Sequence, residues 1–263
     1  MDFVRDDGKC VIIAMDHGAS MGVIGGLENA EGAIRSMSAA DGLLLTYGAA
    51  RRYSDLLRET RMPFILRCDH LTSLMPTKPS EIDGYCLIAD LDEVQRLGAS
   101  GVMLYLVLGM NSTEASVKNI ETVAGFADAC EEAGLPLFVE TVLWGRNFIR
   151  EEQNDVRYVR HACRIASELG ADIIRAPYTG SVESFAEVVG SSYVPVTVMG
   201  GDRTDAGSAL QDVRSAMDAG ASGAVLGKSV WQNREPAKML KAVVRVVHEG
   251  ASVDGALSAA DLR

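Results

Sequence analysis

The chain has 263 residues, of which 48% are apolar and 23% charged. This length suits one large domain, and the composition excludes a disordered, collagen-like or fibrous protein. No apolar run approaches the roughly 18–20 residues that a membrane span needs, so we expect no membrane association. The formal charge of −11 argues against a nucleic-acid partner, because phosphate contacts need a basic surface.

Several other classes of protein are disfavoured by local patterns. The charged N-terminus, Met1 to Asp7, shows no basic segment followed by an apolar one, so we expect no signal peptide and a cytoplasmic location. The five cysteines form no CxxC pair and are expected to be buried free thiols. The histidines form no HExxH pair, and no GxGxxG or P-loop motif occurs. We therefore predict no metal site and no cofactor.

Short apolar runs recur along the whole chain and are separated by amphipathic segments. Continuous apolar runs of this length are typical of parallel strands that are covered on both faces. The eight runs cover residues 10–15, 42–47, 63–67, 101–107, 136–142, 171–175, 195–199 and 222–226.

Helical spacing of apolar residues lies between these runs. The clearest predicted helix covers residues 155–169 and ends before Gly170, which is a typical C-terminal cap. Eight strand–helix units predict a single-domain (β/α)8 barrel over residues 1–263 with almost nothing appended, and a doubly wound sheet is the alternative. The other predicted helices cover about 112–133, 182–190, 205–219 and 233–249.

Active sites of such barrels lie at the C-terminal ends of the strands. Asp16 follows the first strand and is a candidate acid/base, with a capping role as the alternative. His17 is a weaker candidate for substrate binding, since neighbouring side chains on a strand face opposite ways. Arg67 closes the third strand and is a further candidate for substrate binding.

Two charged side chains interrupt apolar strands. Glu140 lies in the fifth strand and Arg175 in the sixth. A buried charge must be paired or must face a polar cavity. An ion pair of Glu140 with Arg67 or Arg175 is therefore the structural alternative to a catalytic role for Glu140.

Glycines follow the last two strands. Gly200 and Gly201 follow the seventh strand, and Gly227 and Lys228 follow the eighth. Backbone N–H groups in such loops approach a phosphate closely, and a cation completes the site. The pattern favours a small phosphorylated ligand, and a pair of tight turns is the alternative.

These segments together resemble the archaeal-type class I fructose-bisphosphate aldolase family (DhnA/LacD/DeoC-type barrels). The similar stretches run in order over nearly the full chain, and they include residues 11–18, 166–174, 178–185 and 220–232. The resemblance implies an aldolase barrel that is metal-free and forms a homo-oligomer. A divalent ion held by Asp16, Asp69, His70 and Glu140 is the alternative.

The chain departs from this family at two positions. Family members form a Schiff base through a lysine in a stretch like Ile-Lys-x-x-Tyr-Thr-Gly, where this chain has Arg175 and Tyr178. They also carry a tyrosine acid/base where this chain has Val142. Arginine stays protonated and does not form an imine in this chemistry. Of the six lysines, only Lys78 and Lys228 are expected to reach the site.

The resulting prediction is an aldolase-like lyase or transferase that acts on a phosphorylated ketose or related carbonyl compound without the usual imine. Asp16 would move a proton of a substrate hydroxyl, Arg175 would bind an oxyanion, and Glu140 would be a second acid/base. Lys228 would bind phosphate, or form the imine if there is one. A phosphosugar isomerase-type enzyme and a non-catalytic phosphometabolite-binding barrel are the alternatives. The predicted substrate and phosphate contacts are His17, Arg67, Tyr178, Gly200, Gly201, Gly227 and Lys228.

Overall fold

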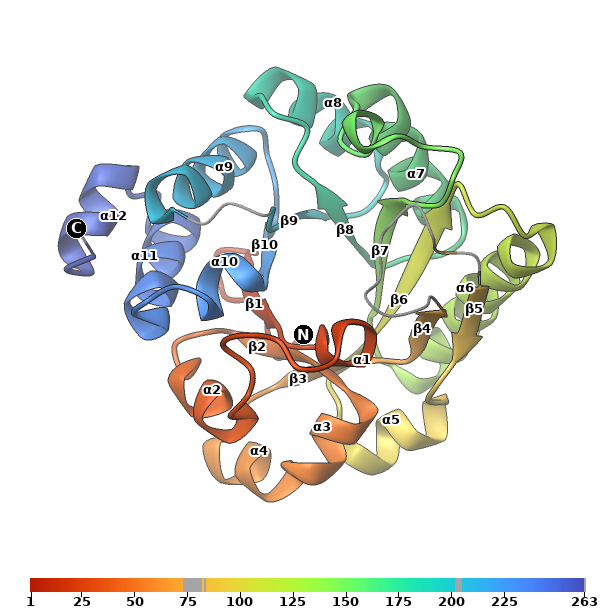
Figure 1. Ribbon diagram of the computed structural model, residues 1–263, viewed down its shortest axis with the longest axis horizontal. Coiled ribbons are helices and arrows are strands. Elements are labelled where there is room, and N and C mark those ends of the chain that lie inside the picture. The colour runs from red at the N-terminus through yellow and green to blue at the C-terminus, as the bar shows by residue number, and fades with distance from the viewer. Residues whose placement is uncertain (73–81, 83, 202–204, 263) are drawn as a thin grey trace.

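Eight parallel strands close into a barrel in the computed structural model, which describes residues 1–72, 82, 84–201 and 205–262 (Figure 1). Every predicted strand is present and begins and ends within two residues of its expected bounds. The (β/α)8 prediction is therefore confirmed, and the strands follow one another around the barrel in the order β1-β10-β9-β8-β7-β6-β3-β2. They are β1 (Cys10–Ala14), β2 (Gly42–Thr46), β3 (Phe64–Arg67), β6 (Gly101–Leu108), β7 (Leu137–Leu143), β8 (Ile173–Pro177), β9 (Val196–Met199) and β10 (Gly223–Leu226).

Helices surround the barrel, and the five predicted ones are present within three residues of their expected bounds. Side chains cap their first turns: Ser112 accepts a hydrogen bond from the backbone of α6, and Asp155 does the same for α7. No helix of the described residues is long and apolar enough to cross a membrane. The longer helices are α2 (Ala30–Ser36), α3 (Tyr47–Arg52), α4 (Ser54–Thr60), α5 (Leu91–Leu97), α6 (Thr113–Ala133), α7 (Val156–Glu168), α8 (Val182–Ser191), α9 (Ala206–Asp218), α11 (Pro236–Glu249) and α12 (Val253–Ala259).

Three short helical turns follow strands at the mouth of the barrel: α1 (Gly18–Met21), η2 (Arg150–Glu152) and α10 (Lys228–Trp231). An antiparallel hairpin, β4 (Asp69–Thr72) and β5 (Gly84–Leu87), is inserted between β3 and α5. This hairpin was not among the elements predicted from the sequence. The first hairpin strand, Asp69 to Thr72, mixes charged, polar and apolar residues, so it lacks the continuous apolar run that identified the barrel strands.

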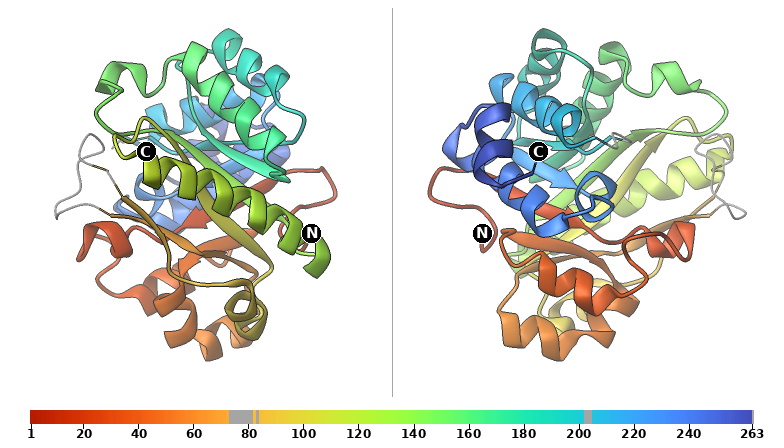
Figure 2. Two further views of the ribbon diagram at one scale, coloured as in Figure 1. Left: turned by 90° about the vertical axis from the view of Figure 1, so that its right-hand side faces the viewer. Right: turned by 60° about the vertical axis from the view of Figure 1, so that its left-hand side comes forward.

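The interior of the barrel is built in layers, because alternate residues of each strand face its axis. The lower layers are apolar, and Phe3 closes them from below with its ring 5.3 Å from that of Phe138. Gly42 and Gly101 pack closely against the neighbouring strands, since a Cβ on either would lie 3.3 Å or 3.1 Å from the carbonyl oxygen of Pro63 or Pro136, respectively. Figure 2 shows the N-terminus and α1 at opposite ends of the barrel.

On three strands, the next inward-facing residue above the apolar layer is charged. Ile65 is followed at the next inward position by Arg67, Phe138 by Glu140, and Ile173 by Arg175. The strand register sets Glu140 beside Arg175. The alternation that builds the apolar core thus also places a charged layer above it, at the mouth of the barrel.

Candidate functional site

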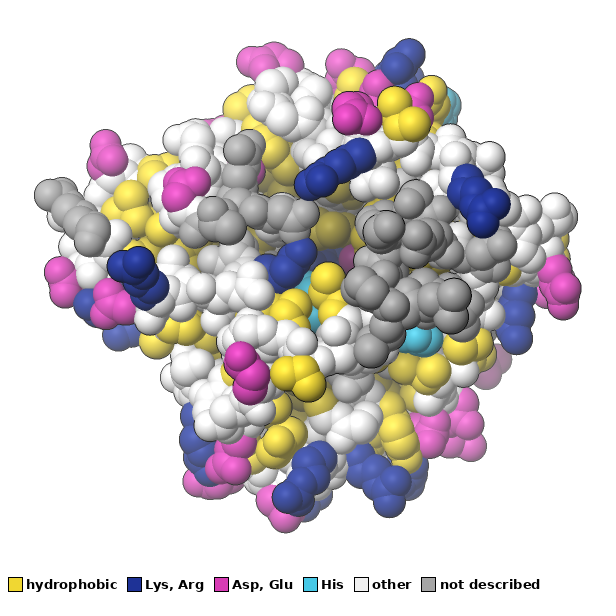
Figure 3. Space-filling view, viewed as in Figure 1, with side chains coloured by type: hydrophobic (Ala, Val, Ile, Leu, Met, Phe, Trp, Pro, Cys, Tyr) yellow, Lys and Arg dark blue, Asp and Glu magenta, His cyan; other side chains and the backbone are white. Residues whose placement is uncertain are grey.

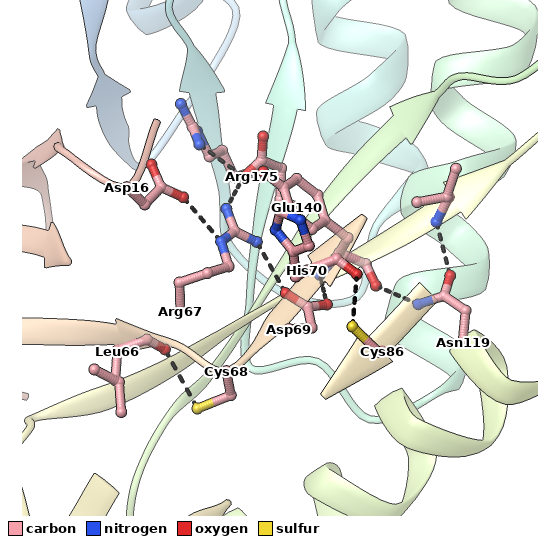
Figure 4. Close-up of polar contacts among 12 residues, drawn as sticks. Asp16, Leu66, Arg67, Cys68, Asp69, His70, Cys86, Asn119, Glu140 and Arg175 are labelled. Carbon is pink, nitrogen blue, oxygen red and sulfur yellow. Dashed lines mark hydrogen bonds and ion pairs between the residues drawn. The ribbon is translucent and has the colours of Figure 1, made fainter. Parts of the chain in front are cut away.

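Five buried charged side chains meet in this layer: Asp16, Arg67, Asp69, Glu140 and Arg175, here called the charge cluster (Figure 4). They come from the end of β1, from β3, β4, β7 and β8, and each is at most 7% exposed. All five were candidates from the sequence, Asp69 only as a ligand in the divalent-ion alternative. Charges this deeply buried are tolerated only when they are paired with one another or with a ligand.

Glu140 bridges the two arginines of the cluster. Its Oε2 atom accepts a hydrogen bond from Nη1 of Arg175 at 2.7 Å and another from Nη2 of Arg67. Both ion pairs that the sequence allowed as the structural alternative are therefore present. The carboxylate holds the two guanidinium groups side by side, whereas its predicted role as an acid/base stays a prediction.

Arg67 makes the largest number of contacts in the cluster. Its Nε donates to Oδ2 of Asp16 at 2.9 Å, and its Nη1 lies 3.5 Å from Oδ1 of Asp69. Its guanidinium carbon lies 3.7 Å from the centre of the Tyr105 ring, a cation–π geometry. The backbone N–H of Tyr105 in turn donates to Oδ2 of Asp69 at 2.6 Å. Arg67 thus links β1, β3, β4 and β6 at the mouth.

The three carboxylates and two guanidinium groups carry a net charge of −1 when all are ionised. Burial raises the pKa of Asp69 to about 7. Burial acts in the same direction on Asp16, but Arg67 and the other neighbouring groups together outweigh it and hold the pKa of Asp16 below its usual range. Near neutral pH, Asp16 is therefore the ionised base of the cluster, and Asp69 is the group that exchanges a proton.

Two N–H groups of the cluster donate no hydrogen bond within the described residues. Nε of Arg175 and Nη1 of Arg67 are buried, and neither has a hydrogen-bond acceptor within the part of the chain that the structure describes. A buried donor without an acceptor is costly, and such groups are typical of sites that bind a ligand or a water molecule. The cluster therefore offers the Nε–H of Arg175 to an acceptor atom of a ligand, whereas Nη1 of Arg67 already faces Oδ1 of Asp69 at 3.5 Å.

His17 lies beside Asp16, with its Nδ1 atom 3.5 Å from Oδ1 of the carboxylate. The expectation that the two side chains point apart was wrong, because the chain leaves β1 and starts α1 at this point. The His17 ring also packs against Trp231, with centroids 5.3 Å apart. Burial lowers the pKa of His17, so the ring is neutral near pH 7, and the charge of Lys228 contributes to this shift.

Close packing against His17 explains why residue 227 is a glycine. A Cβ at this position would lie 2.6 Å from Cε1 of His17, so the close packing of the ring requires glycine. A small cavity next to it, between β9, β10 and α9, is lined in part by Gly200, Gly201 and Ser229. Phosphate binding by these glycines and by Lys228 stays a prediction. Lys78, Asp202 and Arg203 lie outside the described residues.

Tyr178 lies away from the charge cluster. Its ring packs against Phe185 of α8, with centroids 5.6 Å apart, and it belongs to the layer between the barrel and its helices. Within the described residues, no hydrogen bond or ion pair joins Tyr178 to the cluster. Its predicted contact with substrate stays a prediction that this geometry does not support.

Apolar side chains that the sequence analysis did not single out lie above the charged layer. Val107 and Met110 at the end of β6, with Val142 and Trp144 at the end of β7, form a surface here called the apolar wall. The Trp144 ring lies 5.9 Å from that of Tyr105. Alternate residues of β7 face the barrel axis, so the series Glu140, Val142 and Trp144 could have identified this wall from the sequence.

Two glycines bring the loops after β6 and β7 together beside the wall. Both Gly109 and Gly145 have positive φ, and a Cβ on Gly145 would lie 2.1 Å from the carbonyl oxygen of Gly109. This close approach fixes the backbone next to Trp144. Figure 3 shows the mouth as a hollow in the middle of this face, with Lys or Arg, His and apolar side chains along it.

A larger cavity, of about 560 Å³, lies near the other end of the barrel. Its lining includes Arg58, Arg61 and Arg96. These arginines lie at or near the C-terminal ends of α4 and α5, where cations offset the negative end of the helix dipole. The arginines therefore have a structural explanation, and the same dipoles disfavour an anionic ligand.

The carboxylates at the mouth face guanidinium groups rather than one another. Among the residues that the structure describes, no group of three or more His, Cys, Asp or Glu side chains is arranged to hold a metal ion. The four residues of the divalent-ion alternative include His70, which lies on the hairpin strand β4. Nothing in this geometry supports that alternative.

Known proteins with similar sequences and structures agree with this architecture. Residues 10–233 match the family model described as DeoC/LacD family aldolase. The chain is 32% identical to 2-amino-3,7-dideoxy-D-threo-hept-6-ulosonate synthase of Halobacterium salinarum, over 98% of this chain and 94% of that protein. It is also 32% identical to 3-hydroxy-5-phosphonooxypentane-2,4-dione thiolase of Escherichia coli, over 95% of this chain and 80% of that protein.

The solved structure of an archaeal fructose 1,6-bisphosphate aldolase has the same fold. It superimposes with a TM-score of 0.83 at 28% identity, over 94% of this chain and 97% of that one. A Schiff-base-forming fructose-1,6-bisphosphate aldolase gives a TM-score of 0.82 at the same identity. The barrel, its charged mouth and these similarities show that the chain belongs to the DeoC/LacD family of aldolases.

Proposed function

We propose that this protein is a carbon–carbon lyase or transferase for a phosphorylated ketose or related carbonyl compound, and that a guanidinium group replaces the usual lysine imine. The observation that supports this proposal is the position of Arg175, buried in the charge cluster next to Arg67 and bridged to it by Glu140. Among the residues that the structure describes, no lysine belongs to the cluster. The relatives named above include a thiolase of a phosphorylated diketone.

In the proposed cleavage, Asp16 accepts the proton of the substrate hydroxyl that lies β to the carbonyl group. The carbon–carbon bond between the two centres breaks, and its electron pair forms an enolate on the carbonyl side. The hydroxyl carbon leaves as an aldehyde or ketone. Asp16 then transfers this proton to the enolate carbon, which restores the ionised carboxylate.

The guanidinium groups would stabilise the enolate oxygen. A preorganised cation in a site that excludes water stabilises a developing oxyanion strongly, and the Nε–H of Arg175, which has no acceptor among the described residues, is a suitable donor. Glu140 would act as a positioning residue that keeps both groups in place. The neutral His17 ring, beside Asp16, would contact the substrate near the transferred proton.

The phosphate would lie at the ends of β9 and β10, where Gly200, Gly201, Gly227 and Lys228 surround the start of α10. A phosphorylated carbonyl compound held there would extend its reacting carbons over the charge cluster. The homo-oligomer, the cytoplasmic location and the single domain over residues 1–263 stay predictions. Sedimentation, fractionation and limited proteolysis would test these three in turn.

Borohydride reduction with intact-protein mass spectrometry tests the proposal. The protein is mixed with dihydroxyacetone phosphate and reduced, while a parallel sample in deuterated water reports exchange of a substrate C–H bond. We expect exchange without a reduced adduct, because the proposed route has no imine. An adduct that disappears in Lys228→Arg would overturn the proposal and assign the imine to Lys228.

Two further outcomes address the alternatives that the sequence left open. Interconversion of ketose and aldose phosphates without bond cleavage would indicate the isomerase-type enzyme. Binding of phosphorylated ketones without exchange or cleavage would indicate a non-catalytic barrel. A panel of ketose phosphates, with fructose 1,6-bisphosphate included, separates these outcomes from the proposed lyase.

A further inference from the structure

We infer that the part of the substrate remote from its phosphate is apolar, and that the apolar wall is the subsite that binds it. This inference rests on the proposed function and narrows its substrate class. The wall consists of Val107, Met110, Val142 and Trp144, as defined above.

The wall lies directly above the reacting groups. Along β7, the inward positions run from Phe138 in the apolar core to Glu140 in the charge cluster and then to Val142. Along β6, Tyr105 lies level with Glu140, and Val107 is the next inward residue. A ligand with its carbonyl group at the charge cluster would therefore meet these side chains next.

The wall and the predicted phosphate site lie on different parts of the barrel rim. The wall belongs to β6 and β7, whereas the glycines follow β9 and β10, and β8 with Arg175 lies between them. A chain of atoms that runs from one to the other passes the charge cluster. The phosphate end, the reacting carbons and the remote end of one substrate thus have three separate surroundings.

The wall has little capacity for hydrogen bonds. Val107 and Val142 carry no polar atom in their side chains, Met110 carries only a weakly accepting sulfur, and Trp144 adds one indole N–H. The first three are at most 5% exposed and belong to an apolar cluster that also contains residues of the β4–β5 hairpin. A polyhydroxylated carbon chain placed here would lose hydrogen bonds to water without regaining them, which weakens binding by about tenfold for each unpaired hydroxyl. An alkyl or aryl group would gain affinity from the same surface.

A matched pair of phosphomonoesters tests the inference without requiring turnover. n-Pentyl phosphate and ribitol 5-phosphate both carry five carbons, and calorimetric titration gives the affinity of each. We expect n-pentyl phosphate to bind at least tenfold more tightly than ribitol 5-phosphate. Its binding should also change the tryptophan fluorescence of the protein, and this change should be absent in Trp144→Phe.

Two isosteric substitutions provide the matched comparison. Val142→Thr adds one hydroxyl to the wall and should lower the preference for n-pentyl phosphate several-fold. Val139→Thr, on the helix-facing side of β7 and equally buried, should leave the preference unchanged. If Val142→Thr does not fold, Trp144→Gln, at a half-buried position, replaces it.

Equal affinities, tighter binding of ribitol 5-phosphate, or no binding of either ester beyond that of inorganic phosphate would overturn the inference. The lyase proposal fails separately, by the absence of exchange and cleavage in the borohydride and deuterium experiments. A protein that cleaves ketose phosphates but prefers the polyol ester would keep the proposed function and lose the apolar subsite.

Discussion

Replacement of Glu140 by glutamine should destabilise the protein substantially. The Oε2 atom of Glu140 accepts hydrogen bonds from two guanidinium groups, and all three side chains are less than 5% exposed. Glu140→Gln keeps the shape and removes the charge. Removal of one charge from a buried ion pair typically costs about 3–5 kcal/mol. We expect about 3 kcal/mol, because the amide oxygen still accepts one bond and Asp16 still pairs with Arg67.

The same substitution should change how stability depends on pH. Burial, and the charge of Glu140, help to raise the pKa of Asp69 from 3.8 to about 7. Between these values the native state binds a proton that the unfolded state has released, so the free energy of unfolding falls as pH rises, by at most about 4 kcal/mol. Without the charge of Glu140, the pKa of Asp69 is lower, so the free energy of unfolding decreases less as pH rises. The cost of Glu140→Gln should therefore be larger at pH 5 than at pH 8.

Urea denaturation at several pH values between 5 and 8 measures both effects. Asp69→Asn is the control, because it should remove this contribution to the pH dependence both in the original chain and in the Glu140→Gln background, where burial still raises the pKa of Asp69. A cost below about 1 kcal/mol, or an unchanged pH dependence in Glu140→Gln, would refute the reasoning that the cluster is held together by this shared carboxylate.

Three further predictions concern other parts of the fold. Gly227→Ala should lower the free energy of unfolding by about 1–3 kcal/mol, because its Cβ would lie 2.6 Å from the His17 ring. The Cβ of Gly201→Ala would meet no atom of the described residues within 4 Å, so this variant should be nearly neutral in urea denaturation. His248→Gln should cost about 2 kcal/mol, since both ring nitrogens lie within 2.9 Å of aspartate oxygens; a cost near zero would show that these contacts do not hold the N-terminal segment. Ellman's reagent should label one thiol, the half-buried Cys86, in the native protein and five after unfolding, because the other four thiols are buried and burial raises their pKa values.

The barrel could be predicted from the sequence because its strands are buried on both faces. Such strands appear as continuous apolar runs, and the helices between them carry the spacing and caps of amphipathic helices. The β4–β5 hairpin could not be predicted in this way. Its strands have four residues each, and Asp69 to Thr72 mixes charged, polar and apolar side chains without a period.

The site could be predicted only in part. A charged residue inside an apolar run identifies Glu140 and Arg175, and the strand end identifies Asp16. The bridge from Glu140 to both arginines depends on the register and order of β3, β7 and β8, which no local pattern reveals. The same holds for His17, whose direction is set by the turn into α1 rather than by strand alternation.

The three carboxylates of the cluster explain why arginine suits position 175 better than lysine. With a lysine there, three carboxylates would face one arginine and one ammonium group. Glu140 would hold that ammonium protonated, because a nearby negative charge raises the pKa of a lysine, whereas imine formation needs the neutral amine. A permanently charged guanidinium satisfies the same carboxylate without needing to lose a proton.

Arg175→Lys tests this electrostatic argument. Borohydride and dihydroxyacetone phosphate should trap little adduct on this variant at pH 7, because Glu140, whose Oε2 lies 2.7 Å from Arg175 Nη1 in the present structure, would keep the new amine charged. The yield should rise with pH, and it should rise at least tenfold at pH 7 when Glu140→Gln is added. A full yield at pH 7 from Arg175→Lys alone would contradict the argument, since the carboxylates would then not oppose the amine. No adduct from the double variant at any pH would show instead that the carbonyl group of the ligand does not reach position 175.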